Sequence, residues 1–363
     1  MKDKLVIVHH DGDNDGLMGG TLATVRYKKM LEKDEALIFG YDYQPEHEWM
    51  NTVNRLLEDT TVTMEFIDIS PYIPWLETMK TYLEDGLLKI KLYDHHKLKH
   101  DDIMELQLPN ITSYFDDEFC GSRIYYNAWV KDSGGNLMNN RGMNYVFASI
   151  IEQYVKLVDA WDTWKFVNLP GEEQIILAFN ETFMLTKTVL EFYNMMMDHS
   201  YVELINRGMV IVDYQIRNVI PSMLKNSMIT STSIDGIEEH TQLPVLMIQG
   251  KPSYYAEQFL NETFKDKKFV VLYYNMNFTT GEVKLSLRNT VKGTFDCAKL
   301  ARSFDPNGGG HADAAGCTMT FKEFMPLINN AITDSEELSN KKLLEELPVK
   351  GFDSKIIKRL MIN

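Results

Sequence analysis

Four short apolar runs, separated by longer amphipathic segments, are the feature that most constrains the fold of this chain. The runs have the length of β-strands and occupy residues 4–8, 36–40, 62–68 and 87–93. The segments between them, at about 16–31, 47–57 and 73–83, carry the apolar spacing of helices. Strands that alternate with helices favour a parallel sheet covered by helices. We therefore predict an α/β fold for the N-terminal part of the chain.

The rest of the chain changes character twice. From Tyr145 to about Leu224 the pattern is helical, and the amphipathic stretch 201–223 predicts a connector helix. After Pro221 short alternating runs follow, with turn signals between them, which indicates a second, smaller α/β domain. The predicted domains are residues 1–198 and 226–330, with a helical connector at 199–225 and a C-terminal helical tail at 331–363.

Composition and charge limit the partners of the chain. No apolar run reaches the ~20 residues of a membrane span, and the three cysteines form no Cys-x-x-Cys pair, so we expect a cytoplasmic protein that does not enter a membrane. The formal net charge of −15 disfavours a long nucleic acid, which would require a basic surface. Divalent cations held among carboxylates reverse the local sign, so a short phosphorylated substrate at a metal centre is favoured.

The segment from His9 to Gly16 is the first candidate site. His9, Asp11, Asp13 and Asp15 alternate directly after an apolar run, so on an extended backbone they would share one side. Imidazole and carboxylate together suit Mn²⁺, Mg²⁺ or Fe²⁺. A solvated acidic turn is the simpler alternative. An EF-hand calcium loop is excluded, because loop position 12 holds Leu22 instead of glutamate.

Further acidic and imidazole groups follow the other apolar runs. Asp68 ends one run and the triplet Asp94-His95-His96 ends the next. Each alone could be a turn residue or a surface histidine, but a parallel sheet gathers its strand ends along one edge. Asp159 and Asp162 are three residues apart, so on a helix they share a face. We expect these groups to assemble into one metal centre.

In this order the motifs resemble those of the DHH phosphoesterases. The chain has His-x-x-x-Asp-x-Asp-Gly from His9, a lone strand-end Asp68, Asp-His-His and a later acid. Arg288 and the segment from Gly308 to His311 resemble the arginine and Gly-Gly-Gly-His elements of the DHH-associated domain. The resemblance spans about residues 5–320, and the layout is similar to the nanoRNase and phosphoadenosine-phosphatase branch.

The resemblance implies a two-metal site, with Mn²⁺ expected and Mg²⁺ or another divalent ion as the alternative. His9 and Asp13 would hold one ion, Asp15 and His95 the other, and Asp68 would bridge them. Asp162 is the first choice as a further ligand and Asp159 the second. His96 would contact the phosphate and Asp94 would orient an imidazole. The implied substrate-binding residues are Arg288, Gly308, Gly309, Gly310 and His311.

The implied activity is a manganese-dependent phosphoesterase of the oligoribonuclease or exonuclease type, acting on short oligonucleotides. A phosphatase of 3′-phosphoadenosine 5′-phosphate, or a phosphodiesterase of linear or cyclic dinucleotides, is the alternative reaction. An inactive nucleotide sensor is the alternative of another class. The resemblance leaves open whether the protein forms a homodimer. Asp313 departs from expectation, because it puts an acid beside a phosphate-binding segment.

Overall fold

The computed structural model describes most of the chain, and it separates into two compact units. The described residues are 2–42, 47–135, 137, 145–169, 172–225, 228–232, 243–250, 252, 257, 260, 270–291, 293 and 295–337. The units are Met1–Val212 and Asp213–Asn363, so the division falls inside the predicted connector 199–225. Most of the predicted C-terminal tail, from residue 338 onward, lies outside the described residues.

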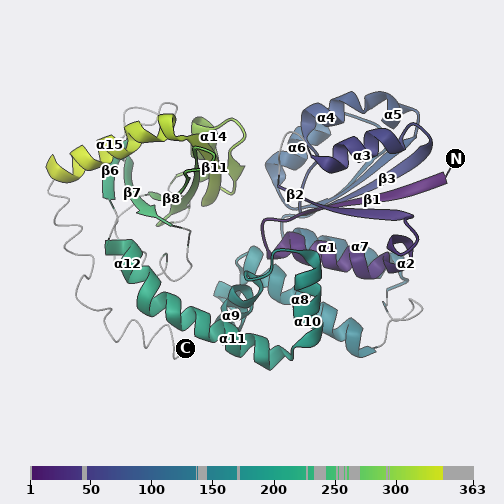
Figure 1. Cartoon of the computed structure of the whole chain (residues 1–363), viewed down its shortest axis with the longest axis horizontal. Coiled ribbons are helices and arrows are strands. Elements are labelled where there is room, and N and C mark those ends of the chain that lie inside the picture. Colours follow the sequence, from purple (N-terminus) through teal and green to yellow (C-terminus); the bar gives the residue numbers. More distant parts are fainter. Residues whose placement is uncertain are drawn as a thin grey trace. The chain divides into compact units, whose positions relative to one another are not determined.

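A five-stranded parallel sheet forms the centre of the N-terminal unit (Figure 1). Its strands run in the order β2-β1-β3-β4-β5, and all four pairings are parallel. The predicted α/β class is confirmed. The strands are β1 (Lys2–His10), β2 (Ala36–Tyr41), β3 (Thr60–Ile67), β4 (Leu88–Asp94) and β5 (Ile111–Phe115).

Helices cover both faces of this sheet (Figure 1). One face packs against α3 (Glu48–Leu56), α4 (Ile73–Thr78), α5 (Lys80–Glu84) and α6 (Lys97–Glu105). Buried Trp49 lies edge-on to Trp75 there, with ring centroids 4.7 Å apart, in a geometry that aromatic pairs favour. The other face is covered by α1 (Asn14–Arg26), α2 (Lys28–Leu31) and α7 (Gly121–Asp132).

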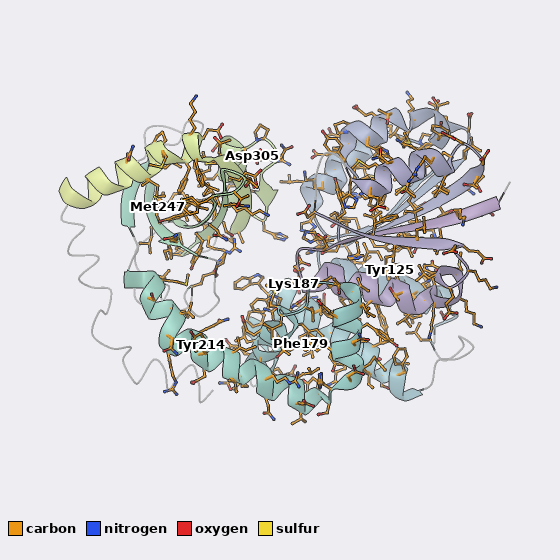
Figure 2. The ribbon with its side chains drawn as sticks, in the orientation of Figure 1. Tyr125, Phe179, Lys187, Tyr214, Met247 and Asp305 are labelled. Carbon is orange, nitrogen blue, oxygen red and sulfur yellow. The ribbon has the colours of Figure 1, made fainter. Side chains whose placement is uncertain are left out.

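A group of helices completes the N-terminal unit. It comprises α8 (Tyr145–Asp162), the short 3₁₀ helix η2 (Lys165–Asn168), α9 (Glu173–Phe183), α10 (Val189–Asp198) and α11 (Tyr201–Tyr214). Phe179 is buried inside this group against Tyr154 and Phe183 (Figure 2). Beyond α11 the helical backbone continues through a π-helical turn, η3 (Gln215–Val219), into α12 (Ile220–Lys225). The helix expected over 201–223 is therefore present.

The C-terminal unit contains a six-stranded mixed sheet in the order β10-β11-β9-β8-β7-β6. Only the β7–β8 pairing is parallel. The strands are β6 (Met228–Thr232), β7 (Leu243–Gln249), β8 (Val270–Asn277), β9 (Glu282–Asn289), β10 (Gly309–Gly310) and β11 (Ala314–Thr320). Helices α14 (Cys297–Phe304) and α15 (Phe321–Glu337) pack on it, with Leu285 and Phe324 in the core. Within the described ranges, no helix has both the length and the apolar character to cross a membrane.

Candidate metal centre

The C-terminal ends of β1, β3 and β4 bring most of the predicted ligands together at one edge of the N-terminal sheet. Among the described residues, three groups place potential ligand atoms within 4.8 Å of one another. Asp68 and His95 each belong to two groups, so neighbouring cations could share them. The groups are Asp68/His95/His96, His10/Asp13/Asp68 and Asp15/His95/Asp162.

Asp68 lies at the centre of this cluster. Its backbone is left-handed, with φ of 57°, which Asp tolerates better than most residues. Its carboxylate is buried, yet neither oxygen accepts a hydrogen bond from a described residue. Oδ1 lies 3.4 Å from His95 Nε2, and Oδ2 lies 3.6 Å from His10 Nδ1. Burial alone would raise the pKa of Asp68, but these imidazoles outweigh it and hold the pKa well below its ordinary value.

Asp13 and His10 form the side of the cluster next to α1. Asp13 caps that helix, because its Oδ1 accepts a hydrogen bond from the backbone N–H of Gly16 at 2.9 Å. Its Oδ2 lies 3.1 Å from His10 Nδ1. Burial would lower the pKa of His10, but Asp13 and Asp68 together raise it well above its ordinary value. A Cβ atom at Gly16 would lie 2.0 Å from the His10 carbonyl oxygen, so glycine is required there.

His9, the predicted ligand next to His10 in the chain, points away from the ligand cluster. Its Nδ1 lies 2.8 Å from the carbonyl oxygen of His10, and its ring packs on Gly20 of α1. Burial lowers its pKa, which favours the neutral ring. His9 belongs to none of the three groups, whereas His10, which the sequence motif did not single out, belongs to one. Neighbouring residues of a strand face opposite sides of the sheet, so only one of the two can meet Asp68.

Asp15 lies in the first turn of α1 and is buried against the start of α7. Its Oδ2 accepts from the Gly121 N–H at 2.7 Å and its Oδ1 from the Ser122 N–H at 2.9 Å. Two backbone donors at a helix N-terminus hold the carboxylate in place. Burial, with Asp68 and Asp162 nearby, raises the pKa of Asp15 well above its ordinary value. A bound cation would offset this concentration of negative charge.

The structure separates the two candidate acids of α8. Asp162 Oδ2 lies 3.3 Å from His95 Nε2 and has no hydrogen-bond partner among the described residues. Burial raises the pKa of Asp162 to about 7. Asp159 instead accepts from the Cys120 N–H at 3.0 Å and pairs with Lys165 Nζ at 2.9 Å. Asp162 therefore lies in the cluster, and Asp159 supports the start of α7 beside it.

Asp94 contacts His96 and belongs to none of the three groups. Its Oδ1 lies 2.8 Å from His96 Nδ1, and its Oδ2 accepts from the Ser70 hydroxyl at 2.8 Å. Burial would lower the pKa of His96, but Asp94 raises it. Asp94 therefore fixes the orientation of the His96 ring.

This donor set fits divalent cations. Carboxylate oxygens and imidazole nitrogens are ligands that Mn²⁺, Mg²⁺ and Fe²⁺ accept. Buried acceptors without a partner are costly, and Asp68 and Asp162 carry such oxygens at the cluster. A cation would satisfy them. The residues that could hold one are His10, Asp13, Asp15, Asp68, His95, His96 and Asp162.

The predicted glycine segment of the C-terminal unit forms a hairpin between β10 and β11. Gly310 has φ of 135°, and a Cβ atom there would lie 2.6 Å from the Ala314 carbonyl oxygen. Gly308 is similarly confined, 2.6 Å from the Ala301 carbonyl oxygen, whereas Gly309 is open. The exposed His311 lies in the tight turn, where its N–H donates to the Ala314 carbonyl at 2.7 Å. The glycines therefore allow close backbone contacts.

Arg288 lies beside this hairpin, because it pairs with Ala314 in the β9–β11 register. Its Nε lies 3.3 Å from Glu257 Oε1, and its guanidinium also donates to Ser286 Oγ at 3.0 Å. Burial raises the pKa of Glu257 to about 7. Glu257 was not predicted, since it follows no motif and becomes Arg288's neighbour only in the folded unit.

The unexpected acid Asp313 has a structural partner. Its Oδ1 accepts from the side-chain amide of Asn289 at 2.9 Å and from the Gly293 N–H at 2.7 Å. The Asn289 N–H also donates to the Asp313 carbonyl at 3.1 Å. Asp313 therefore joins the hairpin to the end of β9.

Comparisons with known proteins assign part of the C-terminal unit to a domain family. Residues 253–335 match the DHHA1 domain family. No curated protein matches the chain significantly. Among solved structures, the chain is similar to a pGpG-specific phosphodiesterase, PggH, from Vibrio cholerae, at 11% identity over 92% of this chain and 99% of that one, with a TM-score of 0.41.

Two further solved structures are similar at comparable coverage. An uncharacterized protein from Helicobacter pylori G27 is 12% identical over 91% of this chain and 99% of that one, with a TM-score of 0.32. A putative family II inorganic pyrophosphatase from Methanococcus jannaschii is 11% identical over 96% and 100%, with a TM-score of 0.27. The DHHA1 match lies in the C-terminal unit and confirms the resemblance expected for that unit.

Proposed function

We propose that this chain is a phosphodiesterase that hydrolyses short oligonucleotides to mononucleotides with two Mn²⁺ ions at the strand-end cluster. The observation that supports the proposal most is the buried Asp68 carboxylate. It belongs to two of the three ligand groups, and neither of its oxygens accepts a hydrogen bond from a described residue. A carboxylate shared in this way suits two neighbouring cations.

The chemistry follows from this ligand set. When bound, divalent ions at such a site lower the pKa of a water molecule and polarise a phosphate ester. His10 and Asp13 would hold one ion, Asp15, His95 and Asp162 would hold the other, and Asp68 would be shared by both. His96, held by Asp94 at 2.8 Å, would donate a hydrogen bond to the phosphate.

The DHHA1 domain would supply the substrate-binding residues. Arg288 would pair with a phosphate through its guanidinium. The hairpin from Gly308 to His311 would let backbone N–H groups approach the ligand closely. The net charge of −15 argues against a long polyanion, so a short substrate is favoured. A cytoplasmic location stays part of the proposal, and the oligomeric state stays open.

Two other functions compete with it. Hydrolysis of 3′-phosphoadenosine 5′-phosphate, or of linear or cyclic dinucleotides, would use the same ligands and differ only in the bound substrate. An inactive nucleotide sensor would bind the same molecules without cleaving them. The seven acidic and imidazole residues that could hold cations favour an enzyme over a sensor.

A substrate panel separates these functions. The purified chain is incubated with Mn²⁺ and labelled two- to five-residue RNA, long single-stranded DNA, phosphoadenosine phosphate and cyclic dinucleotides. We expect the short RNA to be cleaved fastest, Asp68→Asn to be inactive, and Asp85→Asn, at an exposed position outside the ligand groups, to behave as wild type. Cleavage of no phosphoester contradicts the enzyme proposal, and preference for another substrate overturns the choice of oligonucleotides.

A further inference from the structure

A pocket of about 340 Å³ lies between the edge strand β5 and helix α7, outside the three ligand groups. β5 is the last strand of the sheet, and α7 lies across one face of it (Figure 1). The pocket is lined by Tyr114 and Phe119 on one side and by Ile124, Asn127 and Lys131 of α7 on the other.

The wall formed by α7 follows from helical spacing. Ile124, Asn127, Ala128 and Lys131 are three, four and seven residues apart, so they share one face of the helix. The short side chain of Ala128 leaves room between the longer ones. The exposed amide of Asn127 and the exposed ammonium of Lys131 give this wall donors and an acceptor.

Tyr114 gives the pocket a fixed aromatic surface. Its ring stacks on the buried Tyr93 ring, with centroids 4.7 Å apart and an interplanar angle of 4°. Tyr93 is held in turn by an edge-on contact with Tyr125, whose position on α7 is labelled in Figure 2. Tyr114 nevertheless stays 40% exposed. One ring face is therefore immobilised while the remainder is open to a ligand.

Three links connect the lining of the pocket to residues at or beside the candidate metal centre. Phe115 at its rim pairs in register with Asp94 at the end of β4. Phe119 precedes the first turn of α7, whose Gly121 N–H donates to Asp15. Lys165 joins the same regions, because its Nζ lies 4.4 Å from the Phe119 ring and 2.9 Å from Asp159. A molecule bound at the metal centre could therefore extend into the pocket.

We propose that this pocket binds a nucleobase of the substrate, which makes it a subsite of the phosphodiesterase proposed above and rests on that function. The base stacks on Tyr114, since every base offers a π-face to an aromatic ring. Asn127 hydrogen-bonds the base edge, and Lys131 offers a further donor on the same helix face. An aromatic platform beside an amide is typical of single-strand base recognition.

Nucleoside binding tests the subsite without any catalysis. Binding of adenosine, guanosine, cytidine and uridine is measured by ligand-observed NMR with metal absent. Tyr114→Leu keeps an apolar side chain but removes stacking, so affinity should fall roughly 10-fold. Asn127→Ala, on an exposed helix position, should weaken binding while the unfolding temperature stays unchanged. The exposed Phe278→Leu in the C-terminal unit is the matched control and should bind as wild type.

A kinetic comparison distinguishes this proposal from the phosphodiesterase proposal itself. Tyr114→Leu should raise the KM for a trinucleotide by roughly 10-fold and leave the KM for the abasic trinucleotide unchanged. If no variant cleaves either substrate, the phosphodiesterase proposal fails and nucleoside binding alone decides on the pocket. Unchanged nucleoside affinity in both Tyr114→Leu and Asn127→Ala overturns the subsite.

Discussion

At the scale of single residues, the role of Asp94 can be tested. Its contact with His96 predicts that Asp94 orients the His96 ring and is not a metal ligand. Asp94 contacts His96 and Ser70 and belongs to no ligand group. Asp94→Asn should therefore lower kcat/KM by roughly 10- to 100-fold while metal stoichiometry is retained. Steady-state kinetics and calorimetric Mn²⁺ titration check both parts. Loss of a bound ion in this variant would show that Asp94 is itself a ligand.

Glu257 makes a second residue-scale prediction, on stability. Burial raises its pKa from 4.5 to about 7 in the folded protein, so the folded state binds a proton that the unfolded state releases. The stabilisation is present below about pH 4.5 and is lost as pH rises through 7, by at most about 3 kcal/mol. Glu257→Gln should flatten this decline in the free energy of unfolding between pH 5 and pH 8. Denaturant unfolding at both values measures it, and identical slopes in wild type and variant contradict it.

The sequence could identify a candidate ligand only where the position of that residue relative to a strand was clear. Asp68 and His95 were identifiable because they follow apolar runs of a parallel sheet, whose ends share one edge. His9 and His10 were not separable, since Leu5 to Val8 is apolar throughout and gives no alternation to tell the two faces apart. The structure alone places His10 beside Asp68.

At the scale of elements, we expect the conformation of the β10–β11 hairpin to depend on Gly310 far more than on Gly309. Gly310→Ala should be strained, because of its φ of 135° and the 2.6 Å approach to Ala314. We expect a loss of about 1–3 kcal/mol in stability and a raised KM. Gly309→Ala is the matched control, because a Cβ atom there meets nothing within 4 Å. Thermal unfolding and KM measurements test the pair, and equal effects of both substitutions would argue against a shaped hairpin.

Strands and helices were predictable because their apolar periods are strong. The strands expected at 36–40 and 87–93 are found at 36–41 and 88–94. The helix expected over 73–83 is interrupted at Met79 and forms α4 and α5. β10 was not among the predicted strands, because a Gly-Gly pair carries no strand pattern. Its pairing with β11 supplies hydrogen bonds that the local sequence does not indicate.

At the scale of the whole molecule, folding and metal binding should be separable. The N-terminal core is built from buried apolar residues of β1, β3 and β4 with α3 to α6, and the ligand cluster lies at the edge of the sheet. Chelation should therefore abolish activity and leave the secondary structure intact by circular dichroism. Mn²⁺ at 100 times its Kd should stabilise the wild type by about 2.7 kcal/mol, seen as a raised Tm. Chelator-induced unfolding would contradict this separation.

The central claim is that Asp68 is shared by two divalent ions that support phosphoester cleavage. Calorimetric Mn²⁺ titration of wild type and Asp68→Asn, paired with hydrolysis of labelled triribonucleotide by the same samples, tests it most directly. We expect two Mn²⁺ per chain in the wild type, at most one in Asp68→Asn, and a loss of hydrolysis of at least roughly 10³-fold in the variant. Two bound ions and undiminished hydrolysis in Asp68→Asn would contradict the account.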